Sequence, residues 1–152
     1  MFDSFKKLFK HQEVKTSDDS YITIPQSEIN EELKSNIIVL EKLGEQWSTI
    51  LQRKYVNEFE SHGKQSLRVW ICRDIDGDEL EGLTSENCME KEYHSQIAIN
   101  YEGPKHDEDF YADTIYLWHY YGGYFKSSGT LYDQSKNDLK SDIEEALKAL
   151  LN

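Results

Sequence analysis

The sequence predicts an α+β domain, in which an antiparallel sheet of about four to six strands carries two helices on one face. Two segments, 29–43 and 139–150, place leucine and isoleucine at helical spacing. Between them lie three segments rich in β-branched and aromatic residues, 67–73, 96–101 and 114–121. We expect both helices to cover the same face, which leaves the other face of the sheet partly open.

The length of 152 residues favours one domain with its own core. We expect residues 1–20 to form a short amphipathic helix and a polar linker, and residues 21–152 to form the α+β domain. The helix could lie on a membrane surface or a partner. We favour a terminal helix that packs on its own domain, because one apolar turn and a half binds weakly. Its apolar side chains are Phe2, Phe5, Leu8 and Phe9.

The first part of the domain is predicted to contain an edge strand and a helix. Residues 21–24 have strand character, and Pro25 ends the strand because it lacks an N–H group. Ser27 is the predicted N-cap of the helix, and Gly44 is the predicted residue just after its end. The apolar stripe of this helix consists of Ile29, Leu33, Ile37, Leu40 and Leu43.

The pattern of residues 47–59 fits both a helix and one face of a strand, and the polar break that follows favours a strand of a hairpin. Residues 67–73 are predicted to be a central strand, because the residues on both faces are apolar. Residues 96–101 alternate as a half-buried strand with Ile97, Ile99 and Tyr101 on the core side. In the last helix, Ser135 is the predicted N-cap. The apolar stripe of that helix is Leu139, Ile143, Leu147 and Leu150.

Residues 114–132 predict a hairpin with a two-residue turn at Gly122-Gly123, since both glycines accept positive φ. This turn pairs Tyr120 with Phe125 and fixes two faces, which a one-residue slip would exchange. The predicted core face carries Tyr116, Trp118, Tyr120, Phe125 and Leu131. The predicted second face carries Ile115, Leu117, His119, Tyr121, Tyr124, Lys126 and Ser128.

The charge is strongly negative, with 17 Lys and Arg against 29 Asp and Glu and a formal net charge of −12. A field of this sign repels nucleic acid and anionic membranes, and it speeds encounter with basic partners. The alternative is that the charge serves solubility alone. No apolar run is long enough to span a membrane, and the N-terminus lacks the apolar core of a signal peptide. With only two cysteines, we expect free thiols and a cytoplasmic protein.

Two patterns in the sequence suggest metal binding. Asp74, Asp76 and Asp78 match the first positions of a calcium loop, but the glycine comes one residue early and the final glutamate is absent. An Asp76-Gly77 hairpin turn explains the same residues better. The second pattern is the set His94, His106, His119, Asp107 and Asp109. No metal-ligand spacing links these residues, so we expect solvated side chains and no cofactor.

The sequence contains no nucleophile or phosphate-binding motif, and Cys72 is expected to be a buried thiol. Two acidic segments, 74–92 and 102–113, flank a tyrosine-rich sheet. This combination favours a non-catalytic binding protein that neutralises a basic protein partner. The most concrete form is a bacterial immunity protein or antitoxin that inhibits a nuclease-like toxin domain. The expected partner-binding residues are Asp76, Asp78, Glu79, Asp107, Glu108, Asp109, His119, Tyr121 and Tyr124.

Three alternatives stay open. A nucleic-acid-mimicking inhibitor of a defence enzyme belongs to the same physical class. A small metal-assisted hydrolase would require His106, Asp107, Asp109 and His119 to converge on one concave site. A small-ligand protein would require an enclosed cavity lined by Tyr116, Trp118 and Tyr120. The sequence does not specify the oligomeric state or the identity of the partner.

Overall fold

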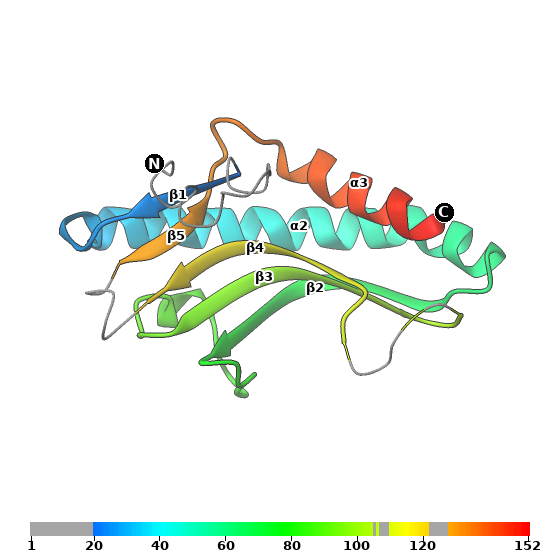
Figure 1. Cartoon of the computed structure of the whole chain (residues 1–152), viewed down its shortest axis with the longest axis horizontal. Coiled ribbons are helices and arrows are strands. Elements are labelled where there is room, and N and C mark those ends of the chain that lie inside the picture. Colours follow the sequence, from blue (N-terminus) through cyan, green and yellow to red (C-terminus); the bar gives the residue numbers. More distant parts are fainter. Residues whose placement is uncertain (1–19, 105, 107–109, 122–127) are drawn as a thin grey trace, which may run out of the picture.

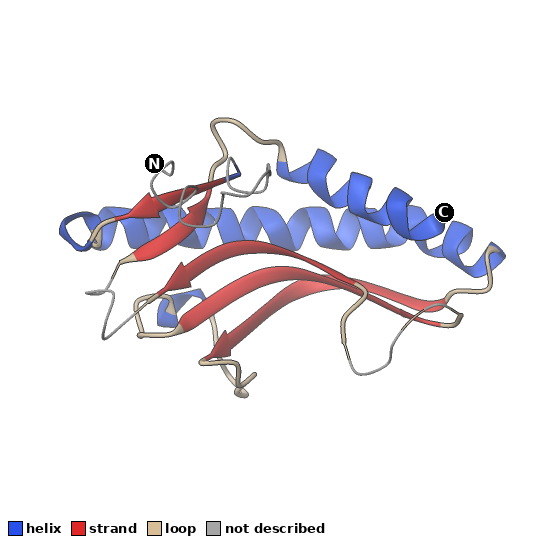
Figure 2. Cartoon of the chain, viewed as in Figure 1, coloured by secondary structure: helices blue, strands red, loops and turns tan. Residues whose placement is uncertain are grey.

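The structure is a computed structural model of the whole chain, and it describes residues 20–104, 106, 110–121 and 128–152. Within these residues a five-stranded antiparallel sheet has the order β1-β5-β4-β3-β2, and two helices cover one of its faces (Figures 1 and 2). The predicted α+β architecture is confirmed. The elements are β1 Tyr21–Ile24, α2 Glu31–Ser61, β2 Gln65–Ile75, β3 Tyr93–Glu102, β4 Asp113–Tyr120, β5 Gly129–Tyr132 and α3 Leu139–Leu151, with short 3-10 turns η2 Gln26–Glu28 and η3 Ser85–Asn87.

Helix α2 is a single helix of 31 residues that crosses the sheet. Asn30 caps it, because its side chain accepts a hydrogen bond from the N–H of Leu33 at 2.9 Å. The predicted cap, Ser27, lies in η2 instead. The predicted end at Gly44 is also wrong, since the helix continues through this residue. Gly44 is buried where the helix meets the sheet, and a Cβ there would lie 2.9 Å from Ile97 Cδ1.

Residues 47–59 form the second half of α2, so the prediction of a hairpin strand is wrong. Leu51, Tyr55 and Phe59 are buried at a spacing of four residues. This spacing is typical of one face of a helix, which was the alternative prediction. Phe59 packs edge-on against Tyr101, with ring centroids 5.8 Å apart. Packing against the sheet therefore determines that residues 47–59 are helical, which their sequence pattern alone left ambiguous.

Strand β1 is an edge strand, as predicted, and it pairs with β5. Strand β2 forms the opposite edge, so its predicted central position is wrong. Its Val69 and Ile71 are buried among core residues that include those of α2, whereas Arg68 stacks on the partly buried Trp70 on the other face. The N–H group of Val69 donates to Gln52 Oε1 of α2 at 2.7 Å.

A two-residue turn at Asp76 and Gly77 follows β2, as predicted. Both residues have positive φ, 52° and 87°. Ile75 and Asp78 exchange two backbone hydrogen bonds of 2.9 Å, which closes the turn. The glycine that comes one residue early in the calcium-loop pattern is therefore the second residue of this turn.

Strand β4 contains a bulge that changes which side chains face the core. Gln96 of β3 pairs with Tyr116 and Ser95 pairs with Trp118, so Leu117 is an extra residue. Leu117 and Trp118 are both fully buried, whereas Tyr116 is 52% exposed. The prediction is thus confirmed for Trp118 and Tyr120, which are buried. It is wrong for Tyr116, which is exposed, and for Ile115 and Leu117, which pack in the core.

The register of the β4–β5 hairpin also differs from the prediction. Tyr120 pairs with Gly129 rather than with Phe125, and Trp118 pairs with Leu131. The predicted turn at Gly122-Gly123 lies outside the described residues. The predicted positions of Tyr124, Phe125 and Lys126 lie outside the described residues, as do those of the N-terminal helix at 2–10.

Helix α3 packs beside α2 and buries the predicted stripe of Leu139, Ile143 and Leu147. Its N-cap is Asp138, which accepts from the N–H of Ser141 at 3.1 Å, and not the predicted Ser135. Glu144 joins the two helices, because its carboxylate accepts from Lys54 at 2.7 Å and from Tyr55 at 2.9 Å. In the described part of the chain, no helix has both the length and the apolar character needed to cross a membrane.

A buried carboxylate connects α2 to three other elements. Glu41 has no exposed surface, and its oxygens accept from Tyr93 Oη at 2.8 Å, Ser85 Oγ at 2.7 Å and Arg73 Nε at 3.0 Å. Burial opposes the charge of Arg73, but Glu41 and Tyr93 together outweigh it and raise the pKa of Arg73. The network fixes η3 and the ends of β2 and β3 under the helix.

Candidate functional site on the open face of the sheet

The two helices cover only one face of the sheet (Figure 1). The opposite face, here called the open face, carries polar and aromatic side chains. Strand alternation and the bulge in β4 determine which residues point to it. They are Arg68, Trp70, Cys72 and Asp74 of β2, His94, Gln96, Ala98 and Asn100 of β3, and Thr114, Tyr116 and His119 of β4. Aromatic rings and ionisable groups thus lie side by side on a surface that no described helix covers, although the loop residue Tyr111 packs over part of it.

A histidine cluster occupies one end of the open face. His94 and His119 are cross-strand neighbours with ring centroids 5.2 Å apart. His94 Nδ1 lies 3.3 Å from a carboxylate oxygen of Asp74, and His119 Nε2 lies 3.7 Å from a carboxylate oxygen of Glu92. The cluster thus places two neighbouring imidazoles between two carboxylates. Tyr116 packs on His94 at 4.9 Å and Tyr121 packs on His119 at 4.3 Å.

Burial lowers the pKa of His119 below its usual value, and the neighbouring His94 lowers it further. Glu92 acts in the opposite direction, because its carboxylate favours the imidazolium form. Near neutral pH the cluster therefore holds His119 as a neutral ring, which donates and accepts hydrogen bonds.

A hollow of about 360 Å³ lies toward the other end of the open face. The guanidinium of Arg68 lies 3.9 Å from the centroid of the Trp70 ring, and Tyr111 packs edge-on against the same ring at 5.1 Å. Cation–π stacking of this kind holds the guanidinium flat. We call this site the arginine hollow, and its lining residues are Ser66, Arg68, Trp70, Glu79, Asn100, Tyr101, Glu102 and Tyr111.

Glu79 ties the acidic segment after β2 to the open face. Tyr111 Oη donates to Glu79 Oε2 at 2.6 Å, and burial together with this carboxylate raises the pKa of Tyr111. Burial and Glu79 also raise the pKa of the Cys72 thiol, which is buried and free, as predicted. Cys72 is therefore held as a neutral thiol, which is a poor nucleophile.

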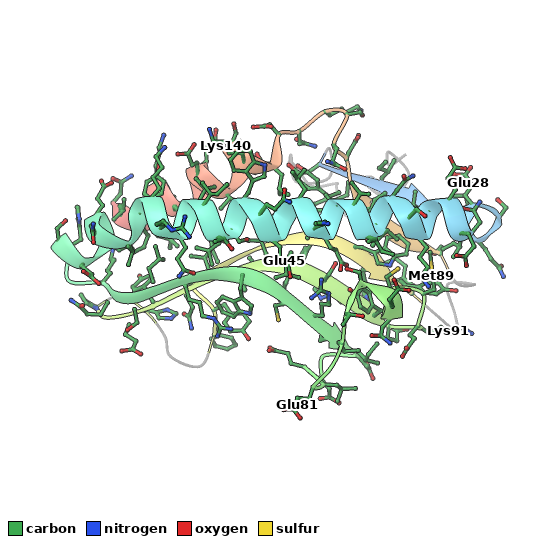
Figure 3. The ribbon with its side chains drawn as sticks, turned by 180° about the vertical axis from the view of Figure 1, so that it is seen from behind. Glu28, Glu45, Glu81, Met89, Lys91 and Lys140 are labelled. Carbon is green, nitrogen blue, oxygen red and sulfur yellow. The ribbon has the colours of Figure 1, made fainter. Side chains whose placement is uncertain are left out.

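The first part of the acidic segment, residues 76–81, extends beyond the sheet on the side away from the helices (Figure 3), whereas η3 in its second part is hydrogen-bonded to Glu41 of α2. Figure 3 shows Glu81 on the loop that follows β2, far from α2. Asp76, Asp78, Glu79 and Glu81 are all exposed. The turn at residues 76 and 77 and the Tyr111–Glu79 hydrogen bond hold these carboxylates beside the open face.

The structure places five of the predicted partner-binding residues. Asp76, Asp78 and Glu79 lie on the acidic segment, and His119 and Tyr121 lie in the histidine cluster. Tyr121 Oη is 3.2 Å from Thr130 Oγ1, which fixes its ring beside β5. The other four, Asp107, Glu108, Asp109 and Tyr124, lie outside the described residues.

The histidines of the hydrolase alternative are not brought together. His106 Nε2 is 2.5 Å from Asn100 Oδ1, whereas His119 pairs with His94. Residues 94 and 100 are six positions apart on one strand, or roughly 20 Å at about 3.3 Å per residue. In the described part of the chain, no three His, Cys, Asp or Glu side chains stand where they could hold a metal ion.

The residues of the small-ligand alternative are also divided. Tyr116 is on the open face, whereas Trp118 and Tyr120 are buried on the helix side. Trp118 Nε1 donates to the carbonyl of Cys88 at 2.8 Å, and a Cβ on Gly129 would overlap the Trp118 ring. These three aromatics therefore share no cavity.

Sequence reasoning missed Arg68, Trp70, Asn100 and Tyr111 of the open face, and it considered Asp74 and His94 only as metal ligands and Tyr116 only as a core or cavity residue. One signal was present, because Arg68, Trp70 and Asp74 alternate on the second face of a strand that was interpreted as central. An edge strand with one covered face carries such residues on its other face. A comparison of the chain with protein-family models, curated proteins and solved structures finds no match in any of the three.

Proposed function

We propose that the protein is a non-catalytic binding protein, which uses the open face and the adjacent acidic segment to neutralise a basic protein partner. The observation that carries this proposal is the position of the acidic segment. Asp76, Asp78 and Glu79 lie beside an exposed face of aromatic and histidine side chains. Negative charge around an aromatic surface suits a basic partner.

The open face supplies the contact area that such a partner needs. Tyr116 is 52% exposed although it lies within a strand, and its ring is supported by His94. Tyrosine contributes a large contact surface at low entropic cost, and it is frequent among the residues that dominate binding energy. The carboxylates act mainly on the rate of encounter, because they steer a basic surface toward the face.

The most concrete form of this function is inhibition of a toxic domain with a basic, nuclease-like surface, as a bacterial immunity protein or antitoxin does. A mimic of nucleic acid that blocks a defence enzyme uses the same physical principle. Both forms require a basic protein and neither requires chemistry by this chain. The net charge of −12 supports them equally.

A pull-down from a lysate of the source organism, at about 50 mM and about 300 mM salt, tests the proposal. The variant D76N/D78K/E79Q changes the acidic segment. Asparagine keeps the positive φ of residue 76, and glutamine keeps an acceptor for Tyr111. We expect the wild type to retain a stoichiometric basic protein at low salt and to release it at the higher salt. The variant should retain far less of it.

The matched control is E45K/E60K, which changes the charge by the same four units on the exposed side of α2. It should retain the partner as the wild type does. Figure 3 shows Glu45 on this helix, away from the acidic segment. Equal retention by both variants, or no basic protein bound at either salt, would contradict the proposal.

A further inference from the structure

The arginine hollow, which lies within the open face, has the composition of a small-molecule site. We infer that it binds a small zwitterion of the α-amino-acid class, with a flat side chain against Trp70 and Tyr111. Its volume of about 360 Å³ falls within the range of small-ligand pockets. The hollow contains unpaired hydrogen-bond donors and a carboxylate acceptor, and a strained residue lies at its edge.

The first donor is Arg68. Its guanidinium stacks on Trp70, and within the described residues it forms no ion pair or hydrogen bond. The protein has 29 acidic residues, so an arginine held flat without a carboxylate is unexpected. Stacking uses the face of the guanidinium and leaves the N–H groups at its edge free. Two such N–H groups can bind the two oxygens of one carboxylate.

The second donor is Asn100, the cross-strand partner of Arg68. His106 Nε2 lies 2.5 Å from Asn100 Oδ1, so the ring nitrogen donates and the amide oxygen accepts. With the amide in this orientation, Asn100 Nδ2 is a donor with no partner in the described part of the chain. Asn100 is thus a second unpaired donor, across from Arg68 on the neighbouring strand.

The acceptor is Glu102, which lies two residues beyond Asn100 on the same side of β3. The two residues are roughly 7 Å apart along the strand, at about 3.3 Å per residue. An α-ammonium group is separated from its carboxylate by two bonds, so one molecule spans the donors and Glu102 with ordinary hydrogen bonds. Glu79 is less available, because it accepts from Tyr111.

Ser66 lies at the edge of the hollow with φ of 57°, a conformation that costs a residue with a Cβ about 1 kcal/mol or more. The register of β2 shifts between Gln65 and Arg68, so Ser66 belongs to a bulge. The bulge turns the end of β2 and sets the position from which Arg68 enters the hollow. Backbone strain of this kind is typical of binding sites.

The charges of the hollow select a zwitterion over a simple ion. A simple anion would be repelled by Glu79, Glu102 and the net charge of −12, and a simple cation would meet Arg68. A zwitterion has no net charge and satisfies both signs locally. The rings of Trp70 and Tyr111 then favour an aromatic side chain over an aliphatic one, through edge-to-face contacts.

NMR titration of the full chain tests this inference, with L-phenylalanine as the probe. The indole N–H resonance of Trp70 reports on the hollow, and that of the buried Trp118 serves as an internal reference. We expect a saturable shift of the Trp70 resonance, roughly millimolar or tighter, while the Trp118 resonance stays in place. Phenethylamine lacks the carboxylate and 3-phenylpropionate lacks the ammonium group. Each should bind about tenfold or more weakly.

The variant R68Q removes the guanidinium and should weaken L-phenylalanine binding by about tenfold or more. The control R53Q removes an exposed arginine of α2 and should bind as the wild type does. Both arginines are exposed, so circular dichroism should show both variants folded. Equal binding by R68Q and the wild type overturns the inference, as does no saturable shift with L-phenylalanine, L-tyrosine or L-tryptophan. If 3-phenylpropionate binds as tightly as L-phenylalanine, the inference that the ligand is a zwitterion is wrong.

Discussion

At the scale of single residues, His119 shows how the open face couples stability to pH. Its pKa is lowered in the folded protein, first by burial and then by His94. In the unfolded chain the pKa returns to about 6.5. The unfolded state therefore binds the proton first as the pH falls. The stability that the neutral ring contributes is complete above pH 6.5 and is lost as the pH falls toward the folded pKa.

The variant H119Q removes this titration and keeps a polar side chain. We expect the urea midpoint of the wild type to fall more than that of H119Q between about pH 7.5 and about pH 5.5, because only the wild type carries the His119 linkage. Equilibrium unfolding followed by far-UV circular dichroism measures both midpoints. If the two proteins lose the same amount, the pKa of His119 is not lowered by folding.

Single residues also mark how far the sequence can predict the open face. The aromatic pattern correctly identified Trp118 and Tyr120 as core residues and His119 and Tyr121 as a separate set. It failed at Tyr116, because the bulge at Leu117 shifts the alternation by one residue. A bulge depends on the neighbouring strand, here on Ser95 and Gln96, and local propensity does not encode it.

At the scale of elements, the length of α2 decides the architecture. The apolar stripe predicted its first half, but Gly44 indicated an end because glycine is common after helices. The glycine is there for contact with Ile71 and Ile97, and this contact exists only once the sheet has formed. For the same reason residues 47–59 could not be assigned from their own pattern, although the strands at 67–73 and 96–101 could.

Glu41 fastens α2 to β2, β3 and η3, and its loss should be costly. The variant E41L leaves the partly buried Arg73 without its carboxylate and removes an acceptor for Tyr93 and Ser85. We expect destabilisation of about 3 kcal/mol, since breaking a buried ion pair by removing one partner typically costs about 3–5 kcal/mol. Urea unfolding measures the change.

The double variant E41L/R73M tests the cause. It removes the unpaired cation, so it should recover a large part of the loss, because a buried pair can often be replaced by apolar side chains. If E41L/R73M is less stable than E41L, then Arg73 stabilises the fold through other contacts, and the role assigned to the ion pair is wrong.

At the scale of the whole molecule, a net charge of −12 on 152 residues opposes folding through self-repulsion. The control variant E45K/E60K lowers this charge by four units at exposed sites, and residue 60 lies near the C-terminus of α2, where a cation is favoured. We expect a higher urea midpoint than that of the wild type at about 10 mM salt. The difference should shrink at about 1 M salt, where the Debye length is about 3 Å.

A difference that persists undiminished at high salt would show that the two lysines act through local contacts. Helix propensity would then be one such contribution, because it does not depend on ionic strength. The same comparison by size-exclusion chromatography would show whether lower charge changes self-association.

The hydrogen bond from Val69 to Gln52 has a consequence for how the protein behaves in a concentrated solution. Val69 lies in β2, an edge strand of 11 residues, and a free N–H at such an edge is a template on which another chain can add a strand. Gln52 reaches from the helix and occupies that donor, and the bulge at Ser66 bends the strand nearby. Helix α2 thus protects the β2 edge of the sheet from pairing with a strand of another molecule. Loss of the Gln52 amide would free the Val69 N–H group, and fibril formation could begin at this edge.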